Sequence, residues 1–429
     1  MNAESVRARM HALREAGARL RARAPSARLA TLARALDRWS DPQSSWRRKL
    51  ESKLPAATGF APETVRRGLA IALADWNGAA LERLAERELG ALRAASAGDP
   101  AFPGFELCAV VLAGAIPMPT LKAIVAPLVL GTPVLVKPAS RDPVTAELVA
   151  RSLAELDPEV GACVALAPLS RSDADAQAAL LESDCVVVYG DDATVSSLAA
   201  RATASRRFVG HGHRLSLAAF GPEVAHGETL AVAAAGLAQD VALWDQLGCL
   251  SPVALYAVGD ARACDRIAES VAAGLAEASS RWPRGEIDAA SAARFAHARA
   301  DAELRAASGT GVSLYADRDG GWCVVREVDA EPRPAPLHRF LRVHPVADAR
   351  ALAAAIAPHA RHLAGVALAG FGAQRAELAR SLRGSGATYV CAPGSLQAPP
   401  LEWESEGRGV LASLARPPSS RRAPSGSLL

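Results

Sequence analysis

The pattern of apolar and polar positions begins with a helical region. Over residues 1 to 97, Ala, Leu and Arg recur at helical spacing, and Val6, Met10, Leu13 and Leu20 fall on one face. Proline interrupts this pattern at positions 25, 42, 55 and 62. We therefore expect several helices in succession, with their arginines on solvated faces.

Short apolar runs then alternate with helical stretches. The first series predicts strands at 107–112, 134–136, 163–166 and 185–188, and helices at 118–130, 143–156, 173–181 and 194–202. The second predicts strands at 253–258, 312–316, 322–328, 340–343, 363–369 and 388–391, and helices at 228–243, 264–278, 289–306, 347–356 and 373–382. Nearly continuous apolar strands that alternate with helices indicate parallel sheets covered by helices.

This pattern divides the chain into four parts. We expect a helical N-terminal region at 1–100, a dinucleotide-binding domain at 101–222 that shares its core with those helices, a second α/β domain at 223–395 and a C-terminal segment at 396–429. The end after residue 417 is rich in Pro and Ser, and we expect it to be disordered. The chain contains no G-x-G-x-x-G sequence, so the usual phosphate fingerprint does not mark the cofactor site.

Composition narrows the class of protein. A chain of 429 residues with 50% hydrophobic and 22% charged residues is typical of a globular protein with two or three domains. Residues 1–50 carry twelve Arg or Lys against four Asp or Glu, but aromatic residues are sparse there and no nucleic-acid motif is present. We therefore expect no nucleic-acid partner. Glu4 and Glu15 also argue against a transit peptide in this basic stretch.

Cysteine usage and hydropathy indicate the compartment. The seven cysteines are scattered, odd in number and without a CxxC pair, which argues for a reducing compartment and against a disulfide framework or a metal cluster. The longest apolar stretch, 123–136, is interrupted by Pro and Gly and is too short for a membrane span. We expect a cytoplasmic protein with no membrane span and no bound metal.

Cys249 is the candidate nucleophile. It lies between Gly248 and Leu250-Ser251-Pro252, after a helical run and just before the strand expected at 253–258. That position places its sulfur at the tip of a loop on a rigid scaffold, where a nucleophile can meet a substrate. A buried cysteine that packs as a small hydrophobe is the alternative.

Several separate stretches, taken together, resemble one protein family. They are Gly114-Ala115-Ile116-Pro117, Val134 to Ser140, Val188 to Val195, Gly212 to Ser216, Asp245 to Pro252, and Pro399 to Trp403. Their order and spacing resemble the acyl-CoA reductase branch of the aldehyde dehydrogenase superfamily, which includes the reductase subunit of bacterial bioluminescence fatty-acid reductase complexes. The resemblance implies an aldehyde dehydrogenase-like fold with two Rossmann-type three-layer α/β/α domains, the second of which carries the catalytic cysteine.

The resemblance also implies a reaction. Cys249 would attack an acyl-CoA or acyl-carrier thioester, and the nicotinamide hydride of NADPH would release a fatty aldehyde from the acyl-cysteine. Hydrolytic relatives carry a glutamate about thirty-five residues before the cysteine, but no carboxylate occurs here between Asp192 and Glu223. A site without that base favours reduction of the acyl-enzyme over its loss to water. An acyl-transferring protein partner and a homo-oligomeric assembly are further expectations.

The same motifs indicate two more positions in the candidate catalytic site. His213 could donate a proton to the forming aldehyde, or it could simply cap a turn or pair with the backbone. Ala115 takes the position of the family's asparagine, whose amide donates to the oxyanion. Loss of one such donor costs roughly 10²–10³ in rate unless the backbone N–H of Cys249 suffices.

The cofactor residues are expected in two motifs. Lys137 would hold the cofactor ribose, with a lysine at a strand end facing water as the alternative. Ser140 replaces a glutamate common in NAD-preferring relatives, and the adjacent Arg141 leaves room for a 2′-phosphate, so NADP is favoured. Gly190 and Asp191 would lie under the pyrophosphate, where the Asp191-Asp192 pair either caps a helix or repels the cofactor.

Three functions remain open on these residues. The first is an NADPH-dependent acyl-CoA reductase, the second a degenerate, non-catalytic partner subunit, and the third an NAD(P)-dependent aldehyde dehydrogenase. Ala115 and the acid pair favour the second, whereas the missing base argues against the third.

Overall fold

The first α/β unit is built on a five-stranded parallel sheet in the order β3-β2-β1-β4-β5. The computed structural model describes residues 1–95, 104–170, 172–224 and 226–416. The strands are β1 (Cys108–Val111), β2 (Val134–Lys137), β3 (Val164–Leu166), β4 (Cys185–Tyr189) and β5 (Arg207–His211). The helices between them are α6 (Pro117–Val129), α7 (Val144–Leu156), α8 (Pro158–Gly161), α9 (Ala174–Leu180) and α10 (Asp192–Arg201).

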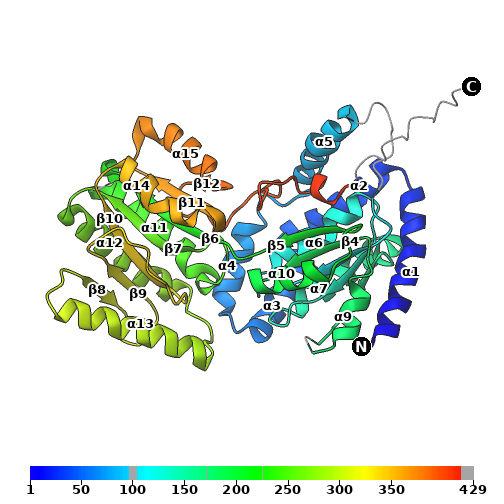
Figure 1. Cartoon of the computed structure of the whole chain (residues 1–429), viewed down its shortest axis with the longest axis horizontal. Helices are drawn as coiled ribbons and strands as arrows, with labels where there is room; N and C mark the ends of the chain where they lie inside the picture. The colour runs from blue at the N-terminus through cyan, green and yellow to red at the C-terminus, as the bar shows by residue number, and fades with distance from the viewer. Residues whose placement is uncertain (96–103, 171, 225, 417–429) are drawn as a thin grey trace, which may run out of the picture.

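The second unit is built on a seven-stranded sheet in the order β12-β11-β6-β7-β10-β9-β8, parallel except for the β8–β9 pair. Its strands are β6 (Leu215–Phe220), β7 (Pro252–Val258), β8 (Ser313–Ala316), β9 (Cys323–Arg326), β10 (Phe340–Val346), β11 (Leu363–Ala369) and β12 (Tyr389–Cys391). Its α-helices are α11 (Gly227–Ala242), α12 (Ala261–Arg281), α13 (Ala289–Ala307), α14 (Ala349–Ile356) and α15 (Arg375–Gly384). Figure 1 shows the two units side by side. The expected α/β fold with two helix-covered sheets is confirmed.

The change from one sheet to the other comes earlier than the expected domain boundary at residue 222. The pattern did not predict β5 or β6, and β6 pairs with β7 and β11 of the second sheet. Only residues 212–214 separate the two strands, so the chain passes between the units there. β5 escaped prediction because it is an edge strand in which arginine, glycine and histidine interrupt the apolar pattern.

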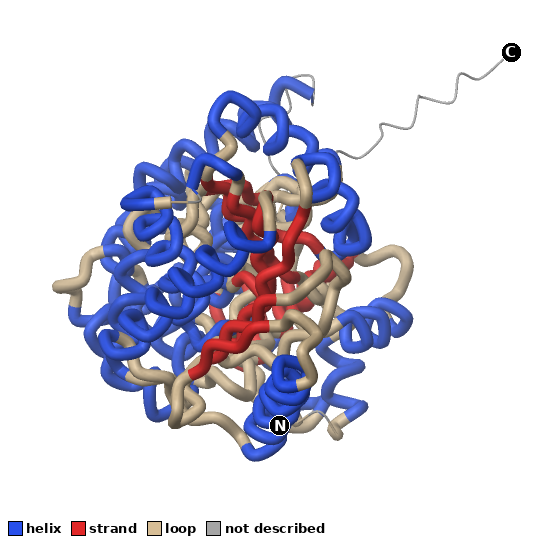
Figure 2. Tube along the Cα trace, turned by 90° about the vertical axis from the view of Figure 1, so that its left-hand side faces the viewer, coloured by secondary structure: helices blue, strands red, loops and turns tan. Residues whose placement is uncertain are grey.

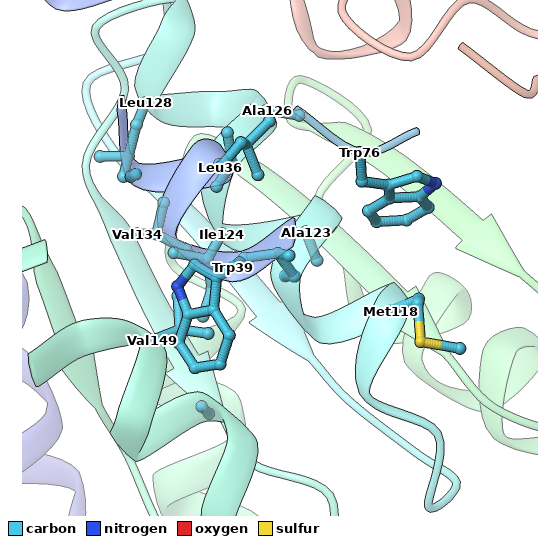
Figure 3. Packing of buried hydrophobic residues seen from close by; sticks show 14 of the residues in the cluster. Leu36, Trp39, Trp76, Met118, Ala123, Ile124, Ala126, Leu128, Val134 and Val149 are labelled. Carbon is cyan, nitrogen blue, oxygen red and sulfur yellow. The ribbon is translucent and has the colours of Figure 1, made fainter. Parts of the chain in front are cut away.

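The N-terminal helices complete the first unit. They are α1 (Ala3–Ala22), α2 (Pro25–Ser40), α3 (Ser45–Thr58), α4 (Pro62–Ala72) and α5 (Gly78–Ala95). Figure 3 shows Leu36 and Trp39 of α2 beside Ile124 of α6 and Val149 of α7. The indole Nε1 of Trp39 donates to Ser152 Oγ at 3.1 Å, which satisfies the polar end of a buried ring. In Figure 2 helices surround the strands, as two such units require.

After β12 the chain returns to the first unit along residues 393–416, here called the C-terminal strap (Figure 1). Trp76 Nε1 donates to the carbonyl of Pro399 at 2.8 Å. Farther along, the carboxylate of Glu88 accepts the backbone N–H groups of Val410, Leu411 and Ala412 at 2.7–2.9 Å. The disorder expected after residue 417 lies outside the described residues. No helix of the described ranges combines the length and apolarity that a membrane crossing needs.

Helix α4 packs against the chain just ahead of Cys249. A Cβ built on Gly68 would lie 2.4 Å from the indole of Trp244, so only glycine permits this approach. Phe60 meets the same indole edge-on at 5.5 Å between ring centroids. The N-terminal helices therefore support the segment that carries the candidate nucleophile.

We expect Gly68→Ala to destabilise the protein by about 1–3 kcal/mol, because the added methyl overpacks a buried ring. Gly90→Ala is the matched control, since Gly90 also lies in a helix and its added Cβ meets nothing within 4 Å. The control should gain about 0.5–1 kcal/mol from helix propensity. Urea unfolding followed by tryptophan fluorescence measures both. Equal stabilisation of the two variants would contradict the close packing of Gly68 against Trp244.

Candidate active site

A cavity of about 1280 Å³ lies where the two units and the C-terminal strap meet. Its lining includes the last residues of β1, β2, β4 and β5, the loop around Cys249, and strap residues from 397 onward. The carboxyl ends of parallel strands are where α/β proteins bind ligands. The volume exceeds the ~300–1,000 Å³ of ordinary small-molecule sites, which suits a site for two ligands.

The structure brings five of the eight expected site residues to this cavity: Cys249, His213, Lys137, Gly190 and Asp191. The other three, Ala115, Ser140 and Arg141, are not part of its lining. Ala115 is 3% exposed and packs in the core, although its neighbours Gly114 and Ile116 do face the cavity. Ser140 and Arg141 are exposed in the turn after β2.

The loop that presents Cys249 follows three residues in the left-handed region. Trp244, Asp245 and Gln246 have φ values of 56°, 49° and 63°. Such conformations cost ~1–3 kcal/mol each in non-glycine residues and persist only where the surroundings enforce them. The buried Gln246 amide provides part of that constraint. Its Nε2 donates to the carbonyls of Pro252 and Phe340 at 2.8 and 2.9 Å, and its Oε1 accepts the N–H of Phe340.

A buried ion pair provides the rest of the constraint. Arg339 donates through Nε and Nη2 to Asp245 Oδ1 at 3.0 and 2.6 Å, and both side chains are almost wholly buried. Arg339 closes a second left-handed run with Leu337 and His338, whose φ values are 67° and 57°. The hydroxyl of Ser279 and the carbonyls of Trp282 and Pro283 accept the remaining donors of the guanidinium. The two strained turns are therefore bound to each other, and burial lowers the pKa of Arg339.

The backbone of Cys249 is held from β6. Ser216 Oγ donates to the Cys249 carbonyl at 2.8 Å and accepts the N–H of Gly365 at 3.0 Å. Ser216 is fully buried, so this hydroxyl bridges β6, β11 and the cysteine loop. It thereby fixes the direction in which the Cys249 side chain leaves the loop.

The Cys249 side chain is accessible from the cavity. All seven cysteines of the chain are free and described, and Cys249 alone is exposed while six are buried. Enclosure by the cavity walls raises the pKa of the thiol, whereas the N–H groups of Cys249 and Leu250 and the charges of Arg214 and Lys122 favour the thiolate. The packed-core alternative for this cysteine does not hold.

Lys122 is a cavity residue that the motifs did not indicate. Its Nζ donates to the carbonyl of Trp403 in the strap at 2.6 Å. Burial lowers its pKa to about 8, with Glu88 and Cys249 opposing that effect, so the ammonium is still mostly protonated at pH 7. Its rarity, as one of four lysines, was the only sequence signal that could have drawn attention to it.

Two of the histidines that line the cavity have different surroundings. His211 stacks on Tyr189 at 4.4 Å between ring centroids, and burial lowers its pKa to about 4, so it is neutral at physiological pH. His213 is exposed; its N–H donates to Asp192 at 2.8 Å and its carbonyl contacts His362 Nδ1 at 3.1 Å. Both contacts use the backbone of His213. The residue also lines the cavity, where its ring could act as a proton donor.

The acid pair at the start of α10 caps the helix. Asp191 Oδ1 accepts the N–H of Thr194 at 2.7 Å as the N-cap. Asp192 accepts the His213 N–H, and that hydrogen bond lowers the pKa of Asp192. The capping alternative is therefore correct for Asp191, and Asp192 anchors the connection between the two sheets.

Besides Asp191, a second carboxylate, Glu406, lines the cavity, and it comes from the strap. Glu406 is paired with Arg214, whose Nε donates to Glu406 Oε1 at 3.0 Å and whose Nη2 contacts Oε2. No local pattern could have placed residue 406 beside residue 214, because only the return of the strap brings them together. Among the described residues no three His, Cys, Asp or Glu side chains gather in a way that could hold a metal ion.

Comparison with solved structures shows the fold. The chain is similar to an oxidoreductase from Marinobacter aquaeolei, with a TM-score of 0.73, 15% identity, and coverage of 97% of this chain and 90% of that one. It is also similar to an NAD-dependent benzaldehyde dehydrogenase from Corynebacterium glutamicum, with a TM-score of 0.70, 14% identity, and coverage of 97% and 89%. Aldehyde dehydrogenase 21 from Physcomitrella patens gives a TM-score of 0.70 at 14% identity, with coverage of 97% and 87%. These likenesses define the class of fold, which is that of the aldehyde dehydrogenases.

The family follows from the sequence model that matches. The model described as acyl-CoA reductase (LuxC) matches residues 25–416, and the chain belongs to that family. This confirms the resemblance carried by the six motifs. No curated protein sequence matches the chain.

Iodoacetamide should alkylate Cys249 before any other cysteine of the native protein. Because the pKa of its thiol is raised, the rate should still be climbing with pH above the ordinary range of a thiol. Lys122→Met removes a favourable charge, and we expect labelling at pH 8 to slow several-fold. Lys49→Met, at an exposed site over Trp46, is the control. Peptide mass spectrometry over pH 6–10 gives the rates, and an unchanged profile in Lys122→Met would contradict the electrostatic coupling.

Proposed function

We propose that the protein reduces an acyl-CoA, or another acyl thioester with a long chain, to the aldehyde, with NADPH as reductant and Cys249 as nucleophile. The observation that carries the proposal is the exposed sulfur of Cys249 in a cavity that also takes in the carboxyl ends of the first sheet. Membership of the acyl-CoA reductase family supports the same reaction class.

The cavity has a part that fits a nicotinamide dinucleotide. Lys137 at the end of β2, and Gly190 and Asp191 at the start of α10, line it together with Thr194. A Cβ on Gly190 would come within 3.2 Å of the Thr194 side chain, so the turn is built for close approach. Lys137 would bind the ribose, and the helix N-terminus at Gly190 and Asp191 would face the pyrophosphate. When bound, the cofactor supplies the hydride that reduces the acyl carbon.

The residues around Cys249 perform the acyl transfer. The thiolate attacks the thioester carbonyl, the new S–C bond forms, and the donor's thiolate leaves as its C–S bond breaks. Arg214 and Lys122 stabilise the attacking thiolate, as do the N–H groups of Cys249 and Leu250, which would be available to the developing oxyanion once the sulfur is acylated. With Ala115 buried, these backbone donors are the oxyanion donors that we propose. His213 would donate a proton to the oxygen that carries the developing negative charge and would take it back as the C–S bond to Cys249 breaks, so that a neutral aldehyde and the Cys249 thiolate are released.

The preference for NADPH rests on the turn after Lys137. Ser140 brings no carboxylate to repel a 2′-phosphate, and the exposed Arg141 adjacent to it can pair with one. Both residues lie just beyond the cavity lining, where the adenosine end of a dinucleotide anchored at Lys137 would reach solvent. We also propose a cytoplasmic, homo-oligomeric enzyme that receives its acyl group from acyl-CoA or from an acyl-transferring protein.

Incubation with a long-chain acyl-CoA should add one acyl group to Cys249, because this thiol is exposed while the other six are buried. Cys249→Ala should lose both the adduct and aldehyde formation. Cys264→Ala, at a buried cysteine of α12, is the matched control and should acylate like the wild type. Intact-mass spectrometry and NADPH oxidation measure the two steps. Absence of any adduct in the wild type would favour a non-catalytic partner subunit, and equal labelling of Cys249→Ala would refute the nucleophile.

NADPH should bind more tightly than NADH, and Arg141→Ala should narrow the difference by about tenfold, the value of a lost charge-assisted hydrogen bond. Arg151→Ala, at an exposed helical arginine paired with Glu147, is the control. Quenching of protein fluorescence gives both dissociation constants. A preference for NADH in the wild type would count against the assignment, as would an Arg141→Ala variant that keeps the full difference.

A further inference from the structure

The mechanism above leaves one carboxylate of the cavity unused. Glu406 lines the cavity, yet its side chain is only 6% exposed. It belongs to the C-terminal strap, which the first unit holds through Trp76, Glu88 and Lys122. A carboxylate at a buried position in a reaction cavity is a general base whenever it is free to accept a proton.

The ion pair with Arg214 prevents Glu406 from accepting a proton. Its Nε donates to Glu406 Oε1 at 3.0 Å and its Nη2 contacts Oε2, so both carboxylate oxygens are engaged by one guanidinium. Nη1 of the same guanidinium donates to the carbonyl of Arg361 at 2.5 Å, which fixes the fork in place. The next cavity group, His211 Nδ1, lies 3.7 Å from Glu406 Oε1. Arg214 is therefore the group that occupies this carboxylate.

The pair lines the same cavity as the reacting cysteine. Arg214 precedes Ser216 by two residues, and Ser216 Oγ donates to the Cys249 carbonyl at 2.8 Å. Both Arg214 and Glu406 line the cavity into which the Cys249 sulfur is exposed. The Arg214 charge also favours the Cys249 thiolate, which requires the guanidinium to be near the sulfur. A base released at Glu406 would thus share the cavity with the acyl group.

We propose that Arg214 determines the fate of the acyl-enzyme by locking Glu406 in an ion pair, so that the acyl-cysteine waits for reduction and is not hydrolysed. This inference rests on the acyl-cysteine of the proposed function. Arg214 is a positioning residue, and Glu406 is a latent base whose release would turn the reductase toward thioester hydrolysis.

The suppressed reaction is the addition of water to the acyl-cysteine. One oxygen–carbon bond forms between water and the acyl carbon, the S–C bond to Cys249 breaks, and the sulfur leaves as a thiolate. A proton of the water passes to Glu406 and from there to the thiolate, so that the products are a carboxylic acid and the free Cys249 thiol. No oxidant or reductant takes part. The step needs only water and a free carboxylate.

The test measures fatty-acid release from acyl-CoA in the absence of NADPH. Wild type should form the adduct at Cys249 and release little acid, as followed by intact mass and by CoA release over many turnovers. Arg214→Gln should raise the rate of acid release per acyl-enzyme by about 100-fold, the lower end of the ~10²–10⁴ range for a general base. The double variant Arg214→Gln/Glu406→Gln should return to the wild-type level, because its strap is equally disturbed but carries no base. Arg214→Lys should lie in between, since an ammonium cannot engage both oxygens.

A control variant distinguishes base catalysis by Glu406 from a simple increase in the access of water to the cavity. Glu88→Gln weakens the hold on residues 410–412 of the strap without touching the pair, and we expect no rise in acid release. A rise in Glu88→Gln, or in the double variant, would overturn the proposal in favour of a leaking strap. Unchanged acid release in an Arg214→Gln protein that still acylates would overturn it too, while leaving the proposed function intact. A wild type that forms no acyl adduct would overturn both.

Discussion

The active cavity depends on the buried ion pair between Asp245 and Arg339. Each residue lies in a run of three left-handed residues, a conformation that side chains oppose, and neither run is stable by local preference. The pair and the Gln246 amide bind the two runs to each other and to Phe340 at the start of β10. Removing one partner of the pair would leave the other as an uncompensated buried charge, which costs ~3–5 kcal/mol of folding stability. The cysteine loop would then lose the constraint that fixes its direction.

The remaining walls come from parts of the chain that are far apart in sequence. Helix α4 approaches Trp244 closely at Gly68, while Glu88 and Lys122 bind the strap that lines the cavity. The strap in turn brings Glu406 to Arg214. The electrostatics around Cys249 are therefore set by three regions of the chain at once.

Much of the fold was accessible from local pattern. Apolar runs of strand length mark buried parallel strands, since both faces of such sheets are covered, and β11 has the predicted bounds. β5 was missed because an edge strand can carry arginine and histidine, and with β6 unassigned the passage of the chain between the two sheets at 212–214 was not predicted. Sequence also identified Cys249, His213, Lys137, Gly190 and Asp191, which the structure brings to one cavity. All but Cys249 lie at or just after the carboxyl ends of strands of the first sheet, which parallel topology brings to one edge.

The sequence by itself determined most of the order of strands and helices, the family and the candidate cysteine, because periodicity and motif spacing are local properties of the chain. Tertiary structure alone decided which charges surround that cysteine. Lys122, Arg214 and Glu406 are separated by up to 284 residues and meet only after the strap returns. It likewise decided that Ala115 is buried and that Ser140 and Arg141 stand outside the cavity. A motif shows which residue occupies a position, but the burial and the direction of its side chain depend on how distant elements pack.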